Sequence, residues 1–241
     1  MLKAEYTPSP STLSALPIFP LPNLVLFPGM LLPLNVFEPR YLDLVDHVVK
    51  YTQYFGIPLL QTSSGSSDAD QPAIEPIFGI AKLRSHICLK DGRRMIRIEG
   101  VGRVKLVHES TSPHRFREVT AELLPESYPR KLTNFHVLKA QVERIAQMCP
   151  HSERELIKSV LAIHDARILL YTLTALAPSL GMFAGGDVDS IDFFPCQQIR
   201  MQQQSLAAEN GDQRVELLLD YVSSTLQKLL ATMRIPTSML N

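Results

Sequence analysis

Apolar positions dominate the segment from Leu16 to Tyr41, LPIFPLPNLVLFPGMLLPLNVFEPRY, but a proline interrupts them every few residues. Proline lacks the N–H group that a helix interior or a central strand requires, so this segment is neither one helix nor one long strand. The pattern predicts several short strands joined by tight corners, with a turn at residues 27–30 that contains Pro28 and Gly29. Residues 30–36 are then expected to form a buried strand.

A helix is expected to begin at Glu38-Pro39, because proline in the first turn of a helix loses no hydrogen bond. This helix extends to about Lys50 and places four apolar side chains on one face, namely Tyr41, Leu44, Val45 and Val48. Residues 54–60 are predicted to form a further strand. The polar segment 61–76 is predicted to be a loop or a hairpin tip.

From Ile77 to Leu124 the apolar positions recur every second residue, which is typical of strands. Asp91-Gly92 predicts a hairpin with a type I′ turn. Gly100-Val101-Gly102 joins strand-like segments and is expected to be a bulge or a corner. Many short strands with corners favour a small barrel.

Beyond residue 130 the period becomes helical. Ser152 to Glu155 resembles a capping box that opens a helix, which Pro178 is expected to end, and Asp212 is expected to cap a last long helix. We therefore expect an α+β protein with three parts. These are a flexible arm at 1–15, a β-rich subdomain with one helix at 16–126 and a helical bundle at 127–241.

Composition excludes some functions. The 241 residues include 24 Lys and Arg and 24 Asp and Glu, so the zero net charge gives no overall attraction to nucleic acid or to a membrane. The three cysteines are widely spaced and the N-terminus lacks the apolar core of a secretory signal, so a cytoplasmic protein is expected. The apolar runs are too short or too rich in proline to cross a bilayer.

The ordered segments FPLPNLVLFPG, LPL and FEPRY resemble the start of the substrate-binding N-terminal domain of Lon proteases. The resemblance continues more loosely through FGIAKL, KDGRRMIRIEGVGRVKLV and QQQSLAAENGDQRVELLLDYV, and so extends over nearly the whole chain. It implies a PUA-like β pseudo-barrel followed by a helical bundle. It also implies a stand-alone version of a domain that, in the full protease, captures unfolded or tagged proteins.

The sequence contains no GxxxxGK[ST] phosphate loop and no segment for a Ser-Lys protease domain. We therefore expect no enzymatic activity and no cofactor. The seven histidines form no HExxH or HxxxH pattern, so no metal site is expected. Cys149, close to His151, is expected to be a buried structural thiol.

The motif residues that carry the resemblance are predicted to specify the fold, because clusters of turn and cap residues usually do so. Glu38 and Arg40 are expected to interact at the start of the helix, with Tyr41 as an aromatic anchor. The motif residues are Pro20, Pro22, Phe27, Pro28, Gly29, Pro33, Phe37, Glu38, Pro39, Arg40 and Tyr41.

The leading hypothesis is a non-catalytic module that binds exposed apolar segments of polypeptides, in a groove between barrel and bundle, through apolar contacts and strand addition. The candidate contacts in the glycine-bearing link are Met182, Phe183, Phe193 and Phe194, and those in the barrel are Met30, Leu31 and Tyr54. Burial in the core is the alternative for each residue. An adaptor or dimerisation domain, which docks on a folded partner or on a second copy, is the second hypothesis.

Basic residues are dense between Lys82 and Lys105, and PUA-like barrels include RNA binders. Strand alternation predicts that Arg93 and Arg97 share one face and that Arg103 and Lys105 share another. RNA binding through these four residues is therefore an alternative. No aromatic residues for base stacking are interleaved with them, and long cations at a strand edge also prevent aggregation.

Overall fold

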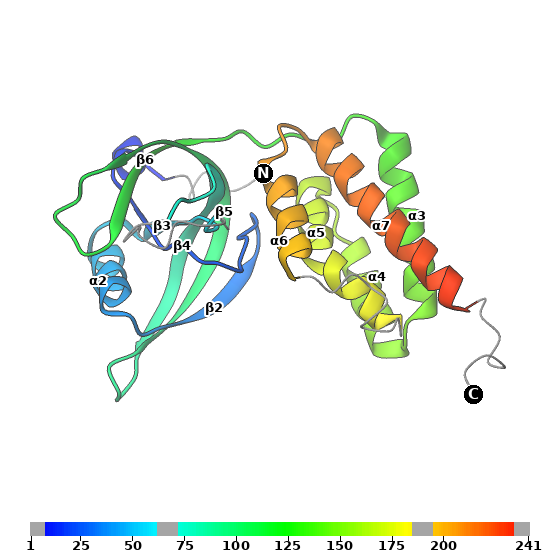
Figure 1. Ribbon diagram of the computed structural model, residues 1–241, viewed down its shortest axis with the longest axis horizontal. Helices are drawn as coiled ribbons and strands as arrows, with labels where there is room; N and C mark the ends of the chain where they lie inside the picture. The colour runs from blue at the N-terminus through cyan, green and yellow to red at the C-terminus, as the bar shows by residue number, and fades with distance from the viewer. Residues whose placement is uncertain (1–7, 62–71, 185–194, 234–241) are drawn as a thin grey trace. The chain divides into compact units, whose positions relative to one another are not determined.

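The computed structural model describes residues 8–61, 72–184 and 195–233. The chain divides into two compact units, Met1–Pro125 and Glu126–Asn241. Figure 1 labels most of the elements of both units. In the first unit the elements are α1 (Pro10–Ser14), β1 (Leu16–Ile18), β2 (Leu31–Val36), α2 (Pro39–His47), the π-helical turn η2 (Val48–Thr52), β3 (Tyr54–Ile57), β4 (Ile77–Cys88), β5 (Arg94–Ser110) and β6 (Arg117–Leu123). In the second they are α3 (Leu132–Met148), α4 (His151–Leu161), α5 (Ala166–Phe183), α6 (Pro195–Ala207) and α7 (Gly211–Met233).

Five strands of the first unit pair in a ring and close a barrel. β1 pairs with β3, β3 with β4, β4 with β5, β5 with β6, and β6 again with β1. The long strand β5 makes this closure possible, because its second half pairs with β6 while its first half pairs with β2. The predicted α+β fold, with a β pseudo-barrel before a helical bundle, is confirmed.

β2 lies outside the closed ring, at one end of the strand order β2-β5-β4-β3-β1-β6. The first half of β5 and the second half of β4 continue beyond the barrel beside it, so that three strands form an extension. β2 was expected to be a buried strand, and this is wrong, since its residues alternate between exposed and half-buried and only Val36 is buried. An edge strand that covers the core with one face has this alternation.

The helix after Pro39 is confirmed, and its four predicted apolar side chains, Tyr41, Leu44, Val45 and Val48, are buried. They pack against the inner side chains of the extension, among them Ile96 and Ile98. One face of the extension is thereby covered by α2.

Two turns were predicted, and the structure contains both. Met30 N–H donates to the Phe27 carbonyl at 3.1 Å, and Gly29 has a φ of 84°, as a type II turn requires. Gly92 has a φ of 87°, but no other described residue of the second hairpin has a positive φ. The type I′ assignment is therefore wrong, because that turn needs two residues with a positive φ. The hairpin has a longer loop instead, and Gly92 is its last residue.

Backbone of the opening segment crosses the sheet where glycines leave space for it. A Cβ atom at Gly79 would lie 2.1 Å from the Leu26 carbonyl oxygen, and one at Gly100 would lie 2.1 Å from that of Phe27. Val101, between Gly100 and Gly102, is the extra residue of a bulge opposite Ile80 and Ala81, as predicted. Residues 10–14 form α1, with Ser9 as its N-cap, so the expected flexible arm does not extend through residue 15.

In the second unit, the apolar sides of the helices form one core. The single helix expected from Ser152 to Pro178 is wrong: α4 ends at Leu161 and Asp165 caps α5, accepting from the Arg167 N–H. Pro178 lies inside α5, where buried Ala177 and Leu180 continue the helical period.

The last helix has a different cap from the one predicted. Asn210 Oδ1 accepts the Gln213 N–H at 3.0 Å, whereas Asp212 Oδ1 accepts the backbone N–H groups of Arg130 and Lys131. Asp212 therefore ties the start of α7 to the segment that leads into α3.

By length and composition alone, α5 is the one described helix that could cross a bilayer. Its buried residues belong to the bundle core, and it packs against α3, α4, α6 and α7. The core position of α5 therefore accounts for its apolar composition.

Candidate functional site

The candidate site is the face of the three-strand extension that α2 does not cover, which we call the outer face. The register places Pro33, Arg97 and Ser85 in one row across the three strands, and Asn35, Met95 and Ile87 in the next. The outer face comprises Leu31, Pro33 and Asn35 of β2, Met95, Arg97 and Glu99 of β5, and Lys82, Ser85 and Ile87 of β4.

Large apolar side chains on the outer face are exposed to solvent. Leu31 is 63% exposed, Ile87 61% and Met95 46%. Strand alternation explains this, because the intervening residues, such as Ile96 and Ile98, point into the core with α2. Exposed apolar side chains on adjacent strands are the usual mark of a site that binds another apolar group.

The backbone of β2 offers hydrogen-bonding groups at its outer edge. The Met30 carbonyl accepts the Gly100 N–H at 2.8 Å, which fixes the alternation along β2. Leu32 and Leu34 therefore direct their backbone groups toward β5, and Leu31, Pro33 and Asn35 direct theirs away from it. In the described residues no further strand pairs with this edge. Pro33, which has no N–H to leave unpaired, stands on the side where proline is tolerated.

The charged residues of the outer face differ in whether they have an ion-pair partner. Glu99 Oε2 accepts the Arg84 Nε–H at 2.6 Å in an ion pair. Arg97, next to it on the same face, has no hydrogen-bond or ion-pair partner among the residues that the structure describes. The outer face thus combines apolar side chains, an edge of free backbone groups and one exposed guanidinium.

The predicted contacts in the barrel have different environments. Leu31 lies on the outer face, as a binding residue would. Met30 is half-buried and packs against the core with α2. Tyr54 is half-buried against the barrel core, with Lys82 Nζ 5.5 Å from its ring centroid. Of the three predicted barrel contacts, the geometry therefore favours Leu31.

Met182 and Phe183 were placed in a link, and this is wrong, since both lie in the last turn of α5. They line an open groove of about 640 Å³ together with Met148, Cys149, Pro150, Glu153 and Ala184. Phe193 and Phe194 lie outside the described residues. As expected, Cys149 is buried: its thiol donates to the Ile145 carbonyl, and burial raises its pKa.

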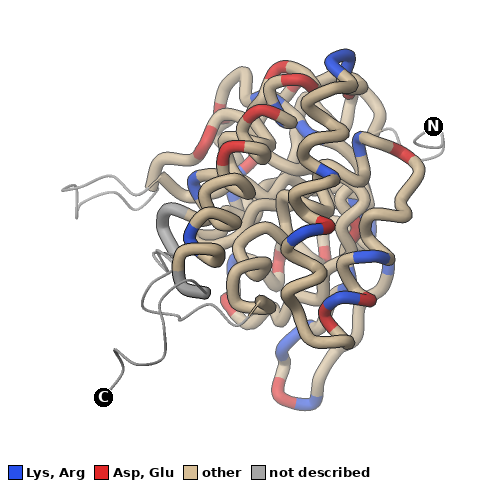
Figure 2. Tube along the Cα trace, turned by 90° about the vertical axis from the view of Figure 1, so that its right-hand side faces the viewer, with Lys and Arg blue, Asp and Glu red and all other residues tan. Residues whose placement is uncertain are grey.

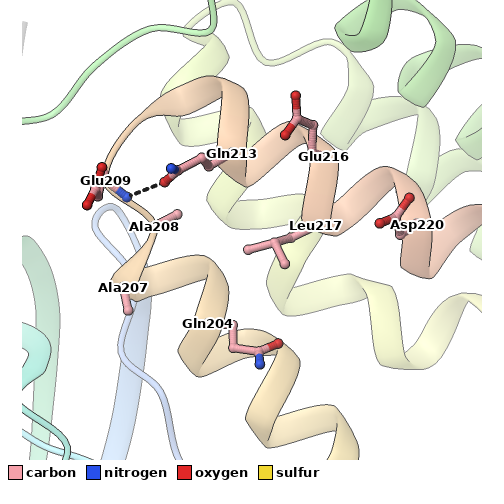
Figure 3. A pocket seen from close by; sticks show the side chains of 8 residues that line it. All are labelled: Gln204, Ala207, Ala208, Glu209, Gln213, Glu216, Leu217 and Asp220. Carbon is pink, nitrogen blue, oxygen red and sulfur yellow. Dashed lines mark hydrogen bonds between the residues drawn. The ribbon is translucent and has the colours of Figure 1, made fainter.

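A second groove, of about 560 Å³, lies between α6 and α7 (Figure 3). Glu209, Glu216 and Asp220 stand around a floor that includes Leu217. Gln213 accepts the Glu209 N–H at 2.9 Å, and Lys131 Nζ binds Glu216 at 3.0 Å. One of the three carboxylates is therefore already neutralised by a lysine.

Several motif residues have the structural roles predicted for them. Arg40 binds Glu38 at 2.8 Å at the start of α2 and lies over the ring of buried Tyr41. Phe27 and Pro28 are buried in the turn before β2. Phe37 is different, since 64% of it is exposed. Phe37 lies directly after β2, and no local pattern in the sequence signals this exposure.

The four basic residues proposed for RNA do not form one surface. Arg103 is only 2% exposed and donates to the Pro125 carbonyl at 3.1 Å, whereas Lys105, which the register places on the same face of β5 as predicted, is exposed. Arg93 lies in the hairpin turn and is paired with Asp91 at 2.7 Å. Arg97 remains as the exposed cation of the outer face.

Both signs of charge are interspersed along the described chain (Figure 2). Within the described ranges 8–61, 72–184 and 195–233, no group of three or more His, Cys, Asp or Glu residues is placed to hold a metal ion. The outer face itself presents apolar side chains, outward backbone groups of β2 and the exposed Arg97 guanidinium.

Known proteins of similar sequence are Lon proteases. The Lon protease of Cytophaga hutchinsonii is 24% identical over 220 residues, which are 90% of this chain and 25% of that protein. The Lon protease of Paraburkholderia phytofirmans is 28% identical over 71% of this chain and 22% of that protein. The chain thus spans about a quarter or less of the length of these relatives.

Among solved structures, the N-terminal domain of a Mycobacterium avium complex Lon protease matches with a TM-score of 0.57 and 17% identity, over 87% of this chain and 98% of that one. The family model of the ATP-dependent protease La (LON) substrate-binding domain matches residues 15–180. This match extends through the barrel and into α5, well over half of the chain. The protein therefore belongs to the LON substrate-binding domain family.

Proposed function

We propose that this protein is a non-catalytic module that binds exposed apolar segments of polypeptides in extended conformation along β2. The observation that carries the proposal is the coincidence, on one strand, of a free backbone edge and an exposed apolar face. An added strand would hydrogen-bond to the outward groups of Leu31, Pro33 and Asn35. Its side chains on one face would then extend the apolar surface of the outer face.

Such binding selects unfolded chains without strict sequence specificity. Backbone hydrogen bonds are available to any extended segment, whereas a folded protein has already paired most of its own backbone groups. Full burial of one leucine-sized side chain contributes at most about 1.5–3 kcal/mol. After the entropy costs of association, a few such contacts support affinities of about micromolar to millimolar strength.

The family supports this proposal, because its description is a substrate-binding domain and its matched relatives are proteases of which this chain spans a quarter or less. Peptide cleavage and ATP hydrolysis are activities of those full-length relatives. We assign to this chain the binding step alone.

Replacement of Leu31 by Asp tests the proposal. Leu31→Asp should weaken binding of an unfolded, apolar-rich polypeptide about tenfold or more, since it introduces a charge into the apolar face. Leu132→Asp is the matched control: Leu132 is 59% exposed in the other unit, at the first position of α3, where an acidic residue is tolerated.

The measurement is fluorescence anisotropy of a labelled, permanently unfolded protein, with urea unfolding of each variant alongside. Both variants should retain their stability within about 0.5 kcal/mol, as surface substitutions do. Equal binding by the wild type and by Leu31→Asp would show that the outer face is not the binding site.

A further inference from the structure

We propose that Arg97 makes the outer face selective for apolar segments that carry a carboxylate at their centre. This inference rests on the proposed function and specifies its substrate class: an extended polypeptide with an acidic residue flanked, two positions away on each side, by apolar residues.

The arginines near the outer face differ in whether an acidic side chain pairs with them. Arg84 pairs with Glu99, Arg93 with Asp91, and Arg94 with Asp46 of α2 at 3.4 Å. Arg97 has no such partner among the described residues, although its neighbour on the strand face is the acidic Glu99. Arg84 already neutralises Glu99, and Lys82, which the register places opposite Glu99, lies over the Tyr54 ring, so Glu99 does not serve as the partner of Arg97.

The register places that charge in the middle of the face. Arg97 lies opposite Pro33 of β2 and Ser85 of β4, two residues with small or short side chains. The row after it holds the apolar Met95 and Ile87, and the row before it holds the apolar Leu31 beside Glu99 and Lys82. An incoming carboxylate would give the exposed guanidinium a charge-assisted hydrogen bond that the described residues do not supply.

Strand addition fixes where the anion must come from. An added strand places one residue beside Pro33, in the same row as Arg97, at two strand spacings or about 9.6 Å from β5. A glutamate there faces Arg97 across Pro33, whose compact ring leaves the space open. The residues two positions away on the same face of the added strand come beside Leu31 and Asn35, where apolar side chains reach the apolar rows.

A set of three peptides tests this inference. Each is a labelled strand of alternating valine and threonine whose central residue is Glu, Gln or Lys. At low salt the wild type should bind the Glu peptide about five- to tenfold more tightly than the Gln peptide, and the Lys peptide most weakly. Added salt should reduce the preference, because the charges lie near the surface.

Two variants separate the effect of Arg97 from the general attraction of a basic surface for an acidic peptide. Arg97→Gln should still bind the Gln peptide but lose the preference for Glu, whereas Lys105→Gln, an exposed cation elsewhere on β5, should keep it. Equal binding of the Glu and Gln peptides by the wild type, or a preference that survives in Arg97→Gln, would overturn the inference and leave the proposed function standing. Absence of binding to all three peptides would overturn both.

Discussion

His47, the last residue of α2, couples its ionisation to the packing of the first unit. Its ring lies 5.0 Å from that of His114, 5.3 Å from Phe116 and 4.9 Å from Tyr51. His114 in turn lies 3.9 Å from Glu118. Burial lowers the pKa of His47 below its ordinary value of 6.5, and the proximity of His114 lowers it further, while Glu118 acts in the opposite direction.

A pH dependence of stability follows from this lowered pKa. The folded state disfavours protonated His47, so the unfolded state binds the proton at higher pH. Stability is full above about pH 6.5 and decreases as the pH falls through the lower, folded pKa. Urea unfolding should be measured at about pH 7.5 and at about pH 5.5. The free energy of unfolding should decrease less between these pH values for His47→Gln than for the wild type.

The matched control for this prediction is His86→Gln, at an exposed histidine of β4. It should leave the decrease as large as in the wild type. An identical pH dependence in all three proteins would contradict the role of His47.

The burial of single residues was predicted well where it depends on neighbours close in sequence. It was predicted poorly where it depends on the other strands of the sheet. The helical period identified Tyr41 and Val48 as buried, because a helix face is defined by its own sequence. In β2, leucines occupy both faces, so the sequence did not reveal that Leu31 is exposed while Leu32 covers the core. Arg103 is buried where it contacts the Pro125 carbonyl, 22 residues further along the chain, and no local pattern encodes that contact.

At the scale of elements, the packing of the opening segment on the sheet depends on glycine. Gly100→Ala should destabilise the first unit by about 2–3 kcal/mol, because the new methyl group would meet the Phe27 carbonyl at 2.1 Å. Gly102→Ala, two residues along the same strand, should cost less than about 1 kcal/mol, since its methyl group would meet side chains and no backbone: Leu123 at 3.3 Å and Ile80 at 3.6 Å.

Urea unfolding, monitored by a probe of β structure, distinguishes the two glycine variants. Similar stabilities for both would show that the segment can move away from the sheet without cost.

The elements themselves were predicted more reliably than their boundaries. The break between α4 and α5, which was not predicted, illustrates the reason. The apolar period continues across residues 162–165, and only the cap at Asp165 reveals a new helix. Pro178 was expected to end α5, but the apolar contacts of its last turns outweigh the one hydrogen bond that proline removes. Asp212 was recognised as a capping residue, although the N–H groups that it accepts precede α3.

At the scale of the whole molecule, the spacing of apolar positions changes from every 2 residues to every 3.6 residues. This change predicted a β-rich part followed by a helical part. The resemblance added the barrel, which alternation alone does not determine, because ring closure requires the pairing of β1 with β6. The position of β2 outside that ring was not predicted, since strand order depends on pairings between residues far apart in sequence. The candidate site therefore became visible only in the structure.

The central claim is that an extended polypeptide adds to the outer edge of β2, and amide hydrogen exchange of β2 tests it most directly. Bound peptide should slow exchange at Leu31 and Asn35, whose N–H groups point outward, by about tenfold or more at saturation. Leu32 and Leu34 should change less, because β5 already holds their N–H groups. Unchanged exchange at Leu31 and Asn35 in the presence of saturating peptide would contradict the account.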